Sequence, residues 1–311
     1  MNAPPSRLYK PTLAALLLGL VPLLAVTGIP AMIVGFRSLR RINSSDGELR
    51  GARLAIAGMI LGALGTAATL AGVVFIVAIK MQLNSQRVEG ANHLRLIGMA
   101  VMPKPDTDDA FPPATRDPHS LPGARRLSWL ADLLPEVAPK ARSLARLEGL
   151  SKLLDREKAW DDIANAKAAA TPVRLFQAPA APNYDPLGSA ITHFVGVGGV
   201  GADAVSLSRD DPRAGMFGHD RGVRPSEVTR GLSYTLLVLE TAHQNGPWIA
   251  GDFPTARGVD AAADRLLGPG LPFGGIEPGY TQALWADGSV RALRDGTPGD
   301  VLRAHATFRE R

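Results

Sequence analysis

The sequence predicts an α+β protein in which a transmembrane helical hairpin is followed by a long helix packed on an antiparallel β-sheet. Three observations support this fold class. Two long uncharged apolar runs lie within residues 1–80, and the second run continues as an amphipathic helix. From about Val173 onward, short apolar runs are separated by Gly, Pro and Asp, a pattern typical of strands and turns.

Each of the two apolar runs is long enough to cross a membrane. Thr12–Phe36 holds 25 residues and Leu54–Ile79 holds 26 residues without a charge, whereas a spanning helix needs about 20. We therefore predict spans at about residues 12–36 and 54–79 within a membrane anchor of residues 1–80. Cleavage of the first run as a signal peptide is the alternative, but signal peptides carry apolar regions of only about 7–15 residues.

Basic residues predict how this anchor is oriented. The short loop between the two runs carries Arg37, Arg40, Arg41, Arg50 and Arg53. Two basic residues, Arg7 and Lys10, precede the first run, and two, Lys80 and Arg87, follow the second. Because Lys and Arg concentrate in cytoplasmic loops, we expect a multi-pass protein of the cytoplasmic (inner) membrane. Its loop lies in the cytoplasm, and both termini and the carboxyl-terminal domain lie outside.

Two glycines in the second run predict close helix packing. Gly58 and Gly62 are four residues apart, and this small-xxx-small spacing lets two helix backbones approach each other closely. The contact is either a dimerisation face or packing against the first helix of the same hairpin. Tethering of the first helix nearby favours the second interpretation.

The distribution of charge argues against nucleic-acid binding. Residues 1–90 carry nine Lys/Arg and three Asp/Glu, which leaves 25 basic against 26 acidic residues for the rest of the chain. The overall charge of +5 therefore comes from the predicted membrane anchor, where basic residues flank spans. The rest of the chain has no basic patch with interleaved aromatic residues.

The second apolar run continues as an amphipathic helix. Its apolar residues recur at steps of three to five positions: Leu83, Val88, Ala91, Leu94, Ile97 and Val101. We predict a stalk helix of residues 81–102 that ends before Pro103, followed by an extracytoplasmic domain of residues 103–311. A proline-rich connection then leads to short helices at SWLADLLPEV and ARSLARLEGLSKLL, broken at Pro135 and Pro139.

Five short runs predict the strands of the sheet. They are VRLF, ITHFVGV, YTLLVLE, ALWA and VRAL. Asp287-Gly288 stands between the last two and is the sharpest hairpin signal, because a type I′ turn needs positive φ at both central residues.

Two stretches of the chain resemble known families. TGIPA, LRRI, LRG and LAIAG within residues 13–66 resemble the two-helix membrane domain called domain of unknown function 4190. NHLRLIGMAV, SWLADLLPEV, VRLFQAPA, ITHFVGVGGVGA and GYTQALWADGSVRAL, in this order within residues 81–308, resemble the pilin-like domain of unknown function 1559. The first resemblance implies anchoring alone. The second implies a long helix on a β-sheet, as in type IV pilins, outside the cytoplasmic membrane.

The chain also departs from the pilin-like pattern. The family's prepilin-like leader, which opens the first helix with Gly-Phe-Thr-Leu-Val-Glu, is replaced by the predicted two-span anchor. Ala178 stands where the resemblance implies Cys, Arg230 where it implies Asp, and Tyr234 where it implies Asn. We therefore expect a permanently anchored relative rather than a processed filament subunit.

The candidate binding residues are few and scattered. Trp160, Trp248 and Glu240 are candidates for a ligand groove, because aromatic residues combine apolar area with a polar donor, although core packing is the commoner role of Trp. Asp287 and other loop aspartates are candidates for calcium, but none has EF-hand spacing. Gly196-x-Gly198-x-x-Gly201 fits the dinucleotide pattern, yet no helix start follows it, so we interpret it as a strand end or loop.

No catalytic motif is assembled along the sequence. The six His and the absence of Cys give neither an HExxH motif nor thiolate metal ligands, and no GxSxG elbow is present. We therefore expect no cofactor and no resident metal. The leading hypothesis is a structural or interaction protein of the bacterial envelope, with the lipid bilayer and an envelope protein or a second copy as partners. The alternative is an envelope hydrolase acting on glycan or peptide.

Overall fold

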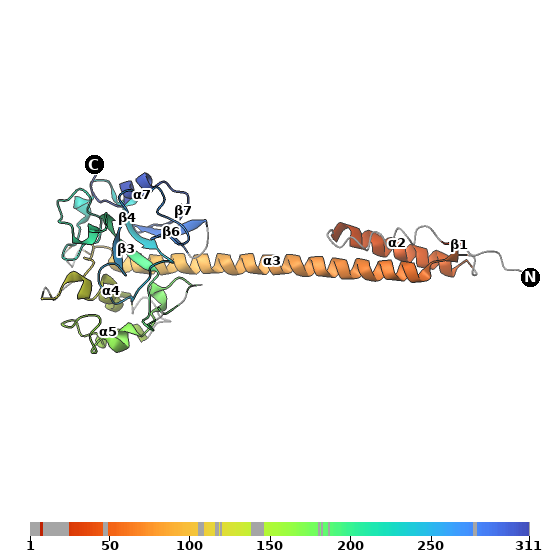
Figure 1. Cartoon of the computed structure of the whole chain (residues 1–311), viewed down its shortest axis with the longest axis horizontal. Helices are drawn as coiled ribbons and strands as arrows, with labels where there is room; N and C mark the ends of the chain where they lie inside the picture. The colour runs from red at the N-terminus through yellow and green to blue at the C-terminus, as the bar shows by residue number, and fades with distance from the viewer. Residues whose placement is uncertain are drawn as a thin grey trace, which may run out of the picture. The chain divides into compact units, whose positions relative to one another are not determined.

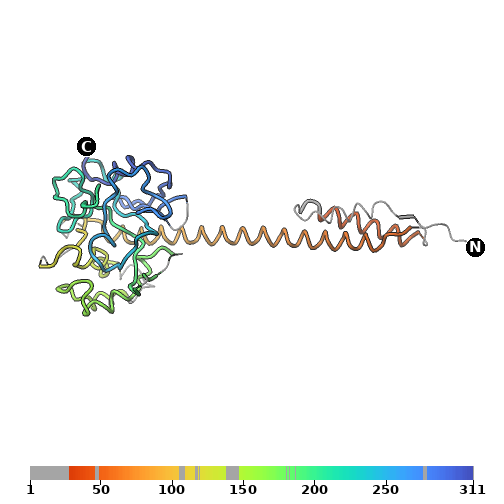
Figure 2. The backbone as a smooth tube through the Cα atoms, in the orientation of Figure 1, coloured from red at the N-terminus to blue at the C-terminus, as the bar shows by residue number. Residues whose placement is uncertain are grey.

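The computed structural model shows two compact units, Met1–Asn84 and Ser85–Arg311 (Figures 1 and 2). The boundary between them falls inside one continuous helix, α3 (Ala52–Val101). The residues that the structure describes are 7–8, 25–45, 49–104, 109–115, 118, 120–137, 146–179, 181, 183–185, 187–275 and 279–310.

The first unit contains α2 (Ala25–Asn43), the first part of α3, and a short parallel pair of strands. In this pair β1 (Arg7–Leu8) lies beside β2 (Leu49–Arg50), with Arg7 opposite Leu49. The predicted first span starts at Thr12, which lies outside the described residues. Its helix continues past the predicted end at Phe36, and the crossing of the membrane by this first run stays a prediction.

Small residues bring α2 and α3 together within the first unit (Figure 1). A Cβ added at Gly62 would lie 2.8 Å from the carbonyl oxygen of Gly28 and 3.1 Å from the Cβ of Ala31. Gly58, one turn earlier, is also buried. Gly62 therefore contacts α2 of the same chain, which is the intrachain alternative considered for this glycine pair.

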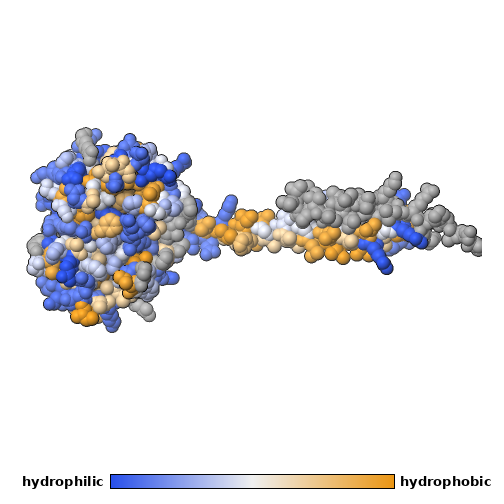
Figure 3. All heavy atoms as spheres, in the orientation of Figure 1, coloured by the Kyte–Doolittle hydropathy of each residue, from blue (hydrophilic) through white to orange (hydrophobic). Residues whose placement is uncertain are grey.

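Among the described residues, α3 is the one helix long and apolar enough to cross a membrane. Its residues beyond the contact with α2 are apolar and exposed, including Leu70 at 59%, Val74 at 67% and Phe75 at 66%. Figure 3 shows this hydrophobic surface along the part of the helix that belongs to the first unit. A water-soluble protein rarely exposes so continuous an apolar surface, so α3 is a candidate membrane anchor.

The second unit is built on a five-stranded sheet in the order β5-β3-β4-β6-β7. The strands are β3 (Phe194–Val200), β4 (Leu236–Glu240), β5 (Ala256–Val259), β6 (Tyr280–Trp285) and β7 (Val290–Arg294). The β3–β4, β4–β6 and β6–β7 pairs are antiparallel, as predicted, but β5 pairs with β3 in parallel. The sheet is therefore mixed rather than purely antiparallel.

One predicted strand was wrong and one strand was missed. VRLF forms a 3₁₀ helix at Arg174–Phe176 rather than a strand, and its Leu175 and Phe176 are both buried in the core. The edge strand β5 was not predicted, because its sequence Ala-Arg-Gly-Val carries little β signal. The hairpin at Asp287-Gly288 is confirmed, but of these two residues only Gly288 has a positive φ, at +81°, so the turn is not of the predicted type I′.

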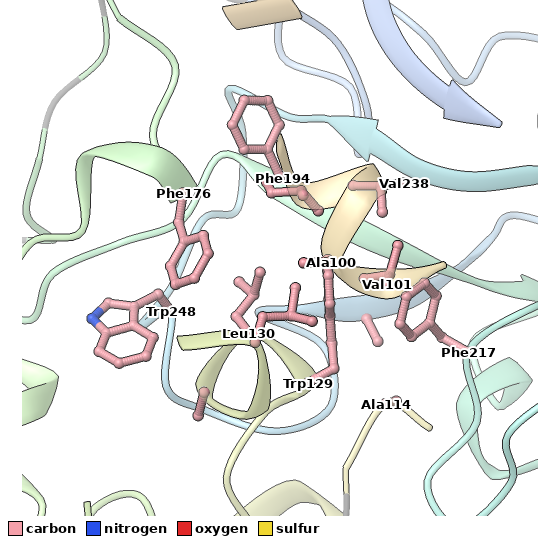
Figure 4. Packing of buried hydrophobic residues seen from close by; sticks show 14 of the residues in the cluster. Ala100, Val101, Ala114, Trp129, Leu130, Phe176, Phe194, Phe217, Val238 and Trp248 are labelled. Atoms are coloured by element: carbon pink, nitrogen blue, oxygen red, sulfur yellow. The ribbon is translucent and has the colours of Figure 1, made fainter. Parts of the chain in front are cut away.

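Each face of the sheet buries its own apolar cluster. On one face, Leu94, Ile97 and Val101 of α3 pack with Phe194 and Trp129 (Figure 4). On the other face, Val195, Leu239 and Trp285 pack with Leu302 of α7 (Gly299–His305). The predicted amphipathic face of residues 94–101 is thus buried against the sheet, whereas Leu83 and Val88 are exposed.

Three short helices contribute buried residues to the cluster that contains Trp129 and Phe194. They are α4 (Trp129–Val137), α5 (Arg146–Lys152) and α6 (Ala166–Ala169). The prediction that Pro135 breaks the helix was wrong, because α4 continues through it. Leu133 and Leu134 are buried on this helix, and this packing offsets the one backbone hydrogen bond that proline removes. Pro139 lies outside the described residues.

Candidate binding cleft

The second unit contains a cleft of about 1080 Å³ where α3 ends. Its walls come from the last turn of α3, residues 110–115, α4 and residues 209–224. Val101, Phe111 and Leu133 are among the apolar residues of the lining, and seven of the 17 lining residues are charged. A cavity of this size suits a drug-sized ligand or a short segment of another chain.

Two ion pairs border the cleft on the α4 side. Asp132 and Glu136 are four residues apart and therefore share one face of α4. Glu136 pairs with Lys104, which follows α3, and Asp132 pairs with Arg156, which follows α5. Each carboxylate thus has a cation beside it.

Arg209 and Arg224 line the opposite side of the cleft, and both are hydrogen-bonded to the carboxylate of Glu227. Nη1 of Arg209 lies 2.8 Å and 2.9 Å from the two carboxylate oxygens of Glu227. The backbone N–H of Arg224 donates to Glu227 at 2.8 Å. Partial burial raises the pKa of Glu227, but the hydrogen bonds from the Arg224 amide and the Arg209 guanidinium outweigh this and lower it overall. Glu227 therefore stays ionised, paired with the Arg209 guanidinium and hydrogen-bonded to the Arg224 backbone.

A buried arginine fixes the segment between these two sides. The side chain of Arg126 is only 7% exposed, pairs with Asp220 at the rim, and donates from Nε to the carbonyl of Leu121 at 2.7 Å. The adjacent Arg221 donates to backbone carbonyls, including that of Gly215 at 2.6 Å. Burial lowers the pKa of the Arg221 guanidinium to about 10, so it remains charged near neutral pH. The wall of the cleft is thus held by side chains that cross between loops.

The arrangement suits binding better than acid–base catalysis. The three acidic residues that line the cleft, Asp132, Glu136 and Asp220, each have a cationic partner. A general acid or base needs a pKa matched to its task, usually reached by burial or by a like charge. Within the described residues, no group of three His, Asp or Glu side chains is arranged to hold a metal ion.

The two predicted tryptophans belong to the core and its margin. Trp248 is fully buried, donates from Nε1 to the carbonyl of Thr171 at 3.0 Å, and packs 5.7 Å from Phe176. Trp160 is half-buried against the same cluster and donates to the carbonyl of Ala124 at 3.0 Å. Neither lines the cleft.

Glu240 and Asp287 lie toward opposite ends of the β4–β6 pair. Glu240 ends β4, is 9% exposed, and accepts a hydrogen bond from the Gln282 amide at 3.1 Å. Asp287 follows Trp285, which is paired with Leu236 at the other end of β4. It accepts from the Ser289 amide at 2.9 Å and pairs with Arg291. The structure therefore does not bring the four predicted binding residues together.

The glycine-rich run has a packing role. Gly196 and Gly198 lie in β3, where a Cβ on Gly196 would meet the Phe217 ring at 2.6 Å. Gly201 follows the strand at a φ of +109°. The residues after it form a single 3₁₀ turn, Ala204–Ser206, rather than a helix that could face a pyrophosphate. The interpretation as a strand end is confirmed.

Sequence reasoning missed the cleft because its charges come from distant segments. Asp132 and Glu136 were the only local signal, since a spacing of four places both on one helix face. Arg209 and Arg224 belong to irregular segments more than 70 positions further along the chain. No periodicity in the sequence predicts that loops so far apart meet.

Comparison with known proteins gives one match. Neither the curated proteins nor the solved structures contain a match to this chain. The resemblance of residues 13–66 to domain of unknown function 4190 stays a prediction. A family model described as protein of unknown function (DUF1559) matches residues 86–270. This match covers more than half of the 311 residues and includes α4, the cleft and most of the sheet, and the chain therefore belongs to the DUF1559 family.

Proposed function

We propose that this chain is a membrane-anchored protein of the bacterial envelope whose second unit works outside the cytoplasmic membrane as a pilin-like structural or interaction module. The observation that carries the proposal is the change of surroundings along α3. Leu70, Val74 and Phe75 are apolar and exposed, whereas Leu94 and Ile97 of the same helix are fully buried by protein. Lipid is the environment that suits the exposed part.

The packing of α3 supports the pilin-like part of the proposal. A Cβ added at Gly98 would lie 2.9 Å from Leu284 of β6, so the helix lies directly on the sheet. Arg87 also stacks over the Tyr280 ring at 4.4 Å. A helix that continues from an apolar segment onto a sheet is the arrangement that the family resemblance implies.

The cleft is the surface on which we expect a partner to bind. Its apolar floor and its positively charged rim at Arg209 and Arg224 suit an acidic segment of another envelope protein or of a second copy. The alternative function, an envelope hydrolase, has no specific support within the described residues, because the acidic residues of the cleft are ion-paired.

Fractionation of cells that express the full chain tests the anchoring. We expect the protein to stay in the membrane pellet after extraction with alkaline carbonate. Protease added to intact cells after outer-envelope permeabilisation should digest the second unit but leave residues of the first unit protected. A chain released by carbonate, or a second unit protected until the cytoplasmic membrane is broken, would refute the proposal.

Cross-linking tests the interaction role. A photoreactive amino acid at Arg224 should give a discrete adduct in membranes, and the same group at Arg265, an exposed arginine outside the cleft lining, should not. Equal adducts at both positions, or none at either, would count against a specific partner at the cleft.

A further inference from the structure

The pairing of β1 with β2 places the amino-terminal residues beside the loop between α2 and α3. Arg7 lies opposite Leu49 and Leu8 opposite Arg50 in a parallel pair (Figure 1). This loop joins the last turn of α2 to the first turn of α3, so it lies at the end of the helix pair where α2 ends and α3 begins. The Leu49 amide donates to Ser45 Oγ at 3.2 Å, which ties the loop to the end of α2.

The pairing of β1 with β2 places Leu8 and Ala25 at different distances from the α2–α3 loop. Because α2 has 19 residues and a helix rises about 1.5 Å per residue, Ala25 lies roughly 27 Å from the loop. Leu8, however, lies at the loop. Leu8 and the end of α2 therefore both lie at the loop, whereas Ala25 lies away from it. A single crossing by the run Thr12–Phe36, which was the expectation from the sequence, would instead place Arg7 on the opposite side.

The pairing places β1 at the end of the first unit that holds the arginines around the α2–α3 connection. Five arginines there are exposed and have no ion pair among the described residues: Arg37, Arg40, Arg41, Arg50 and Arg53. With Arg7 and Lys10, residues 1–53 hold seven basic residues against Asp46 and Glu48. No charge follows from Leu54 to Ile79.

Exposed apolar side chains adjoin these arginines. Phe36, next to Arg37, is 61% exposed, and Ile56, three positions after Arg53, is 45% exposed. Figure 3 shows hydrophilic side chains next to hydrophobic surface in this unit. Free phosphate or a nucleic acid would leave this apolar surface in water. A phospholipid places a phosphate directly beside acyl chains and so satisfies both kinds of surface.

We propose that the arginines around the connection between α2 and α3, beside which β1 pairs, form one basic surface at the cytosolic leaflet, defined by Arg37, Arg40, Arg41, Arg50 and Arg53, that binds the phosphates of acidic phospholipids. Residue 7 and the α2–α3 loop then lie on the same side of the membrane, and α3 crosses it. This proposal rests on the anchoring proposed above and goes beyond it by naming the lipid class and the side on which residue 7 lies.

Cysteine labelling in cells tests the shared side, because the chain contains no Cys of its own. Single variants of the full chain, Ser6→Cys, Ser44→Cys and Ser208→Cys, are treated with a membrane-impermeant maleimide after outer-envelope permeabilisation. We expect Ser208→Cys to react while the cytoplasmic membrane is intact. Ser6→Cys and Ser44→Cys should both react only after that membrane is opened.

The outcomes separate this proposal from the proposed function. If Ser6→Cys reacts together with Ser208→Cys, the first run crosses once and the shared basic surface is refuted, while the anchoring stands. If Ser6→Cys and Ser44→Cys react together in intact cells, the shared side is supported but the orientation behind the proposed function fails.

Lipid enrichment tests the acidic headgroup. The full chain is reconstituted into vesicles of phosphatidylcholine with phosphatidylglycerol, and the lipids retained after mild detergent extraction are measured. We expect phosphatidylglycerol to be enriched, and the variant Arg40→Glu/Arg41→Glu to lose about tenfold of that enrichment. The matched control is Arg265→Glu/Arg294→Glu, which changes two exposed arginines of the second unit by the same charge and should retain it.

Two results would overturn the lipid assignment. Equal enrichment in the Arg40→Glu/Arg41→Glu variant and in the unchanged protein would show that these arginines do not select the headgroup. Loss of the retained lipid on addition of inorganic phosphate, but not of sodium chloride at equal ionic strength, would show a general phosphate site instead.

Discussion

The two parts of α3 carry similar apolar residues in opposite surroundings. In the first unit Val74 and Phe75 are 67% and 66% exposed, whereas in the second unit Leu94 and Ile97 are fully buried. The sequence differs in its pattern. Residues 54–79 are apolar on all sides, whereas apolar residues in the later part recur at helical spacing and alternate with polar ones.

This difference indicates that the two parts of one helix are suited to two environments, lipid for the first part and the protein core for the second. An apolar residue on every side of a helix needs an apolar environment on every side, which lipid supplies. An amphipathic stripe needs only one apolar neighbour, and here the sheet supplies it through residues such as Leu284. The same substitution should therefore have different consequences in the two parts, and this contrast can be measured.

The largest effect is expected from a charge in the buried part. Ile97→Asp places a carboxylate among Trp129, Phe194 and other buried residues with no cation arranged to pair with it. We expect a loss of at least about 4 kcal/mol in the free energy of unfolding of the second unit. Thermal unfolding of the full chain in detergent, followed by tryptophan fluorescence, measures it. A folded variant with an unchanged transition would show that this face of α3 is not part of the core.

The matched change in the exposed part should spare the fold and weaken the insertion. Val74→Asp costs about 2.5–3.5 kcal/mol at the centre of a membrane-spanning helix, but Val74 has no buried contact to lose in the protein. We expect a larger fraction of the chain in the soluble fraction after carbonate extraction, with the unfolding temperature of the second unit unchanged. If Val74→Asp instead unfolded the second unit and left extraction unaffected, Val74 would be shown to pack against protein and not to lie in lipid.

A buried histidine predicts a pH dependence that belongs to the second unit alone. His193, just before β3, is 1% exposed, and burial lowers its pKa from the ordinary 6.5 to about 4. Between these values the unfolded chain binds a proton that the folded chain does not. Stability therefore falls as pH falls from 6.5 to 4, by up to about 3 kcal/mol at 1.36 kcal/mol per pKa unit.

His193→Phe separates this contribution from that of the carboxylates. Hydrogen bonds from Arg213 hold the pKa of Asp203 and of Asp211 below the ordinary value of 3.8, so their contributions are lost only at lower pH. The variant should therefore lose the slope between pH 6.5 and 4 and keep the acid unfolding below it. An unchanged slope in His193→Phe would assign the dependence to other groups.

The sequence predicted the parts of the fold that depend on local pattern. The end of α3 near Met102, the buried face at Leu94 and Ile97, and the hairpin at Asp287-Gly288 follow from periodicity and turn chemistry, and all three are confirmed. Strand β5 was missed because its pairing with β3 is a contact between segments about 60 residues apart. Its sequence alone gives no reason to form a strand.

The candidate site was less predictable than the fold for the same reason. Trp248 and Glu240 were chosen by residue type, and residue type does not distinguish a core anchor from a groove. The cleft depends instead on where loops meet, as in the pairing of Arg126 with Asp220 across 94 positions. Binding residues are often carried by loops held on a rigid scaffold, and loops have no periodicity to interpret.

The smallest effect on stability, but a decisive one for function, is expected at the rim of the cleft. Arg224 is exposed and its side chain has no acidic hydrogen-bond partner among the described residues, so Arg224→Glu should change the free energy of unfolding by no more than about 0.5 kcal/mol. It would nevertheless reverse one charge that the cleft lining offers to an acidic partner. We expect the cross-linked adduct at another lining position, Pro113, to disappear in this variant and to persist in Arg265→Glu. An adduct that persisted in both would show that the partner is held by the apolar floor at Phe111 and Leu133, and charge at the rim would then have no part in its selection.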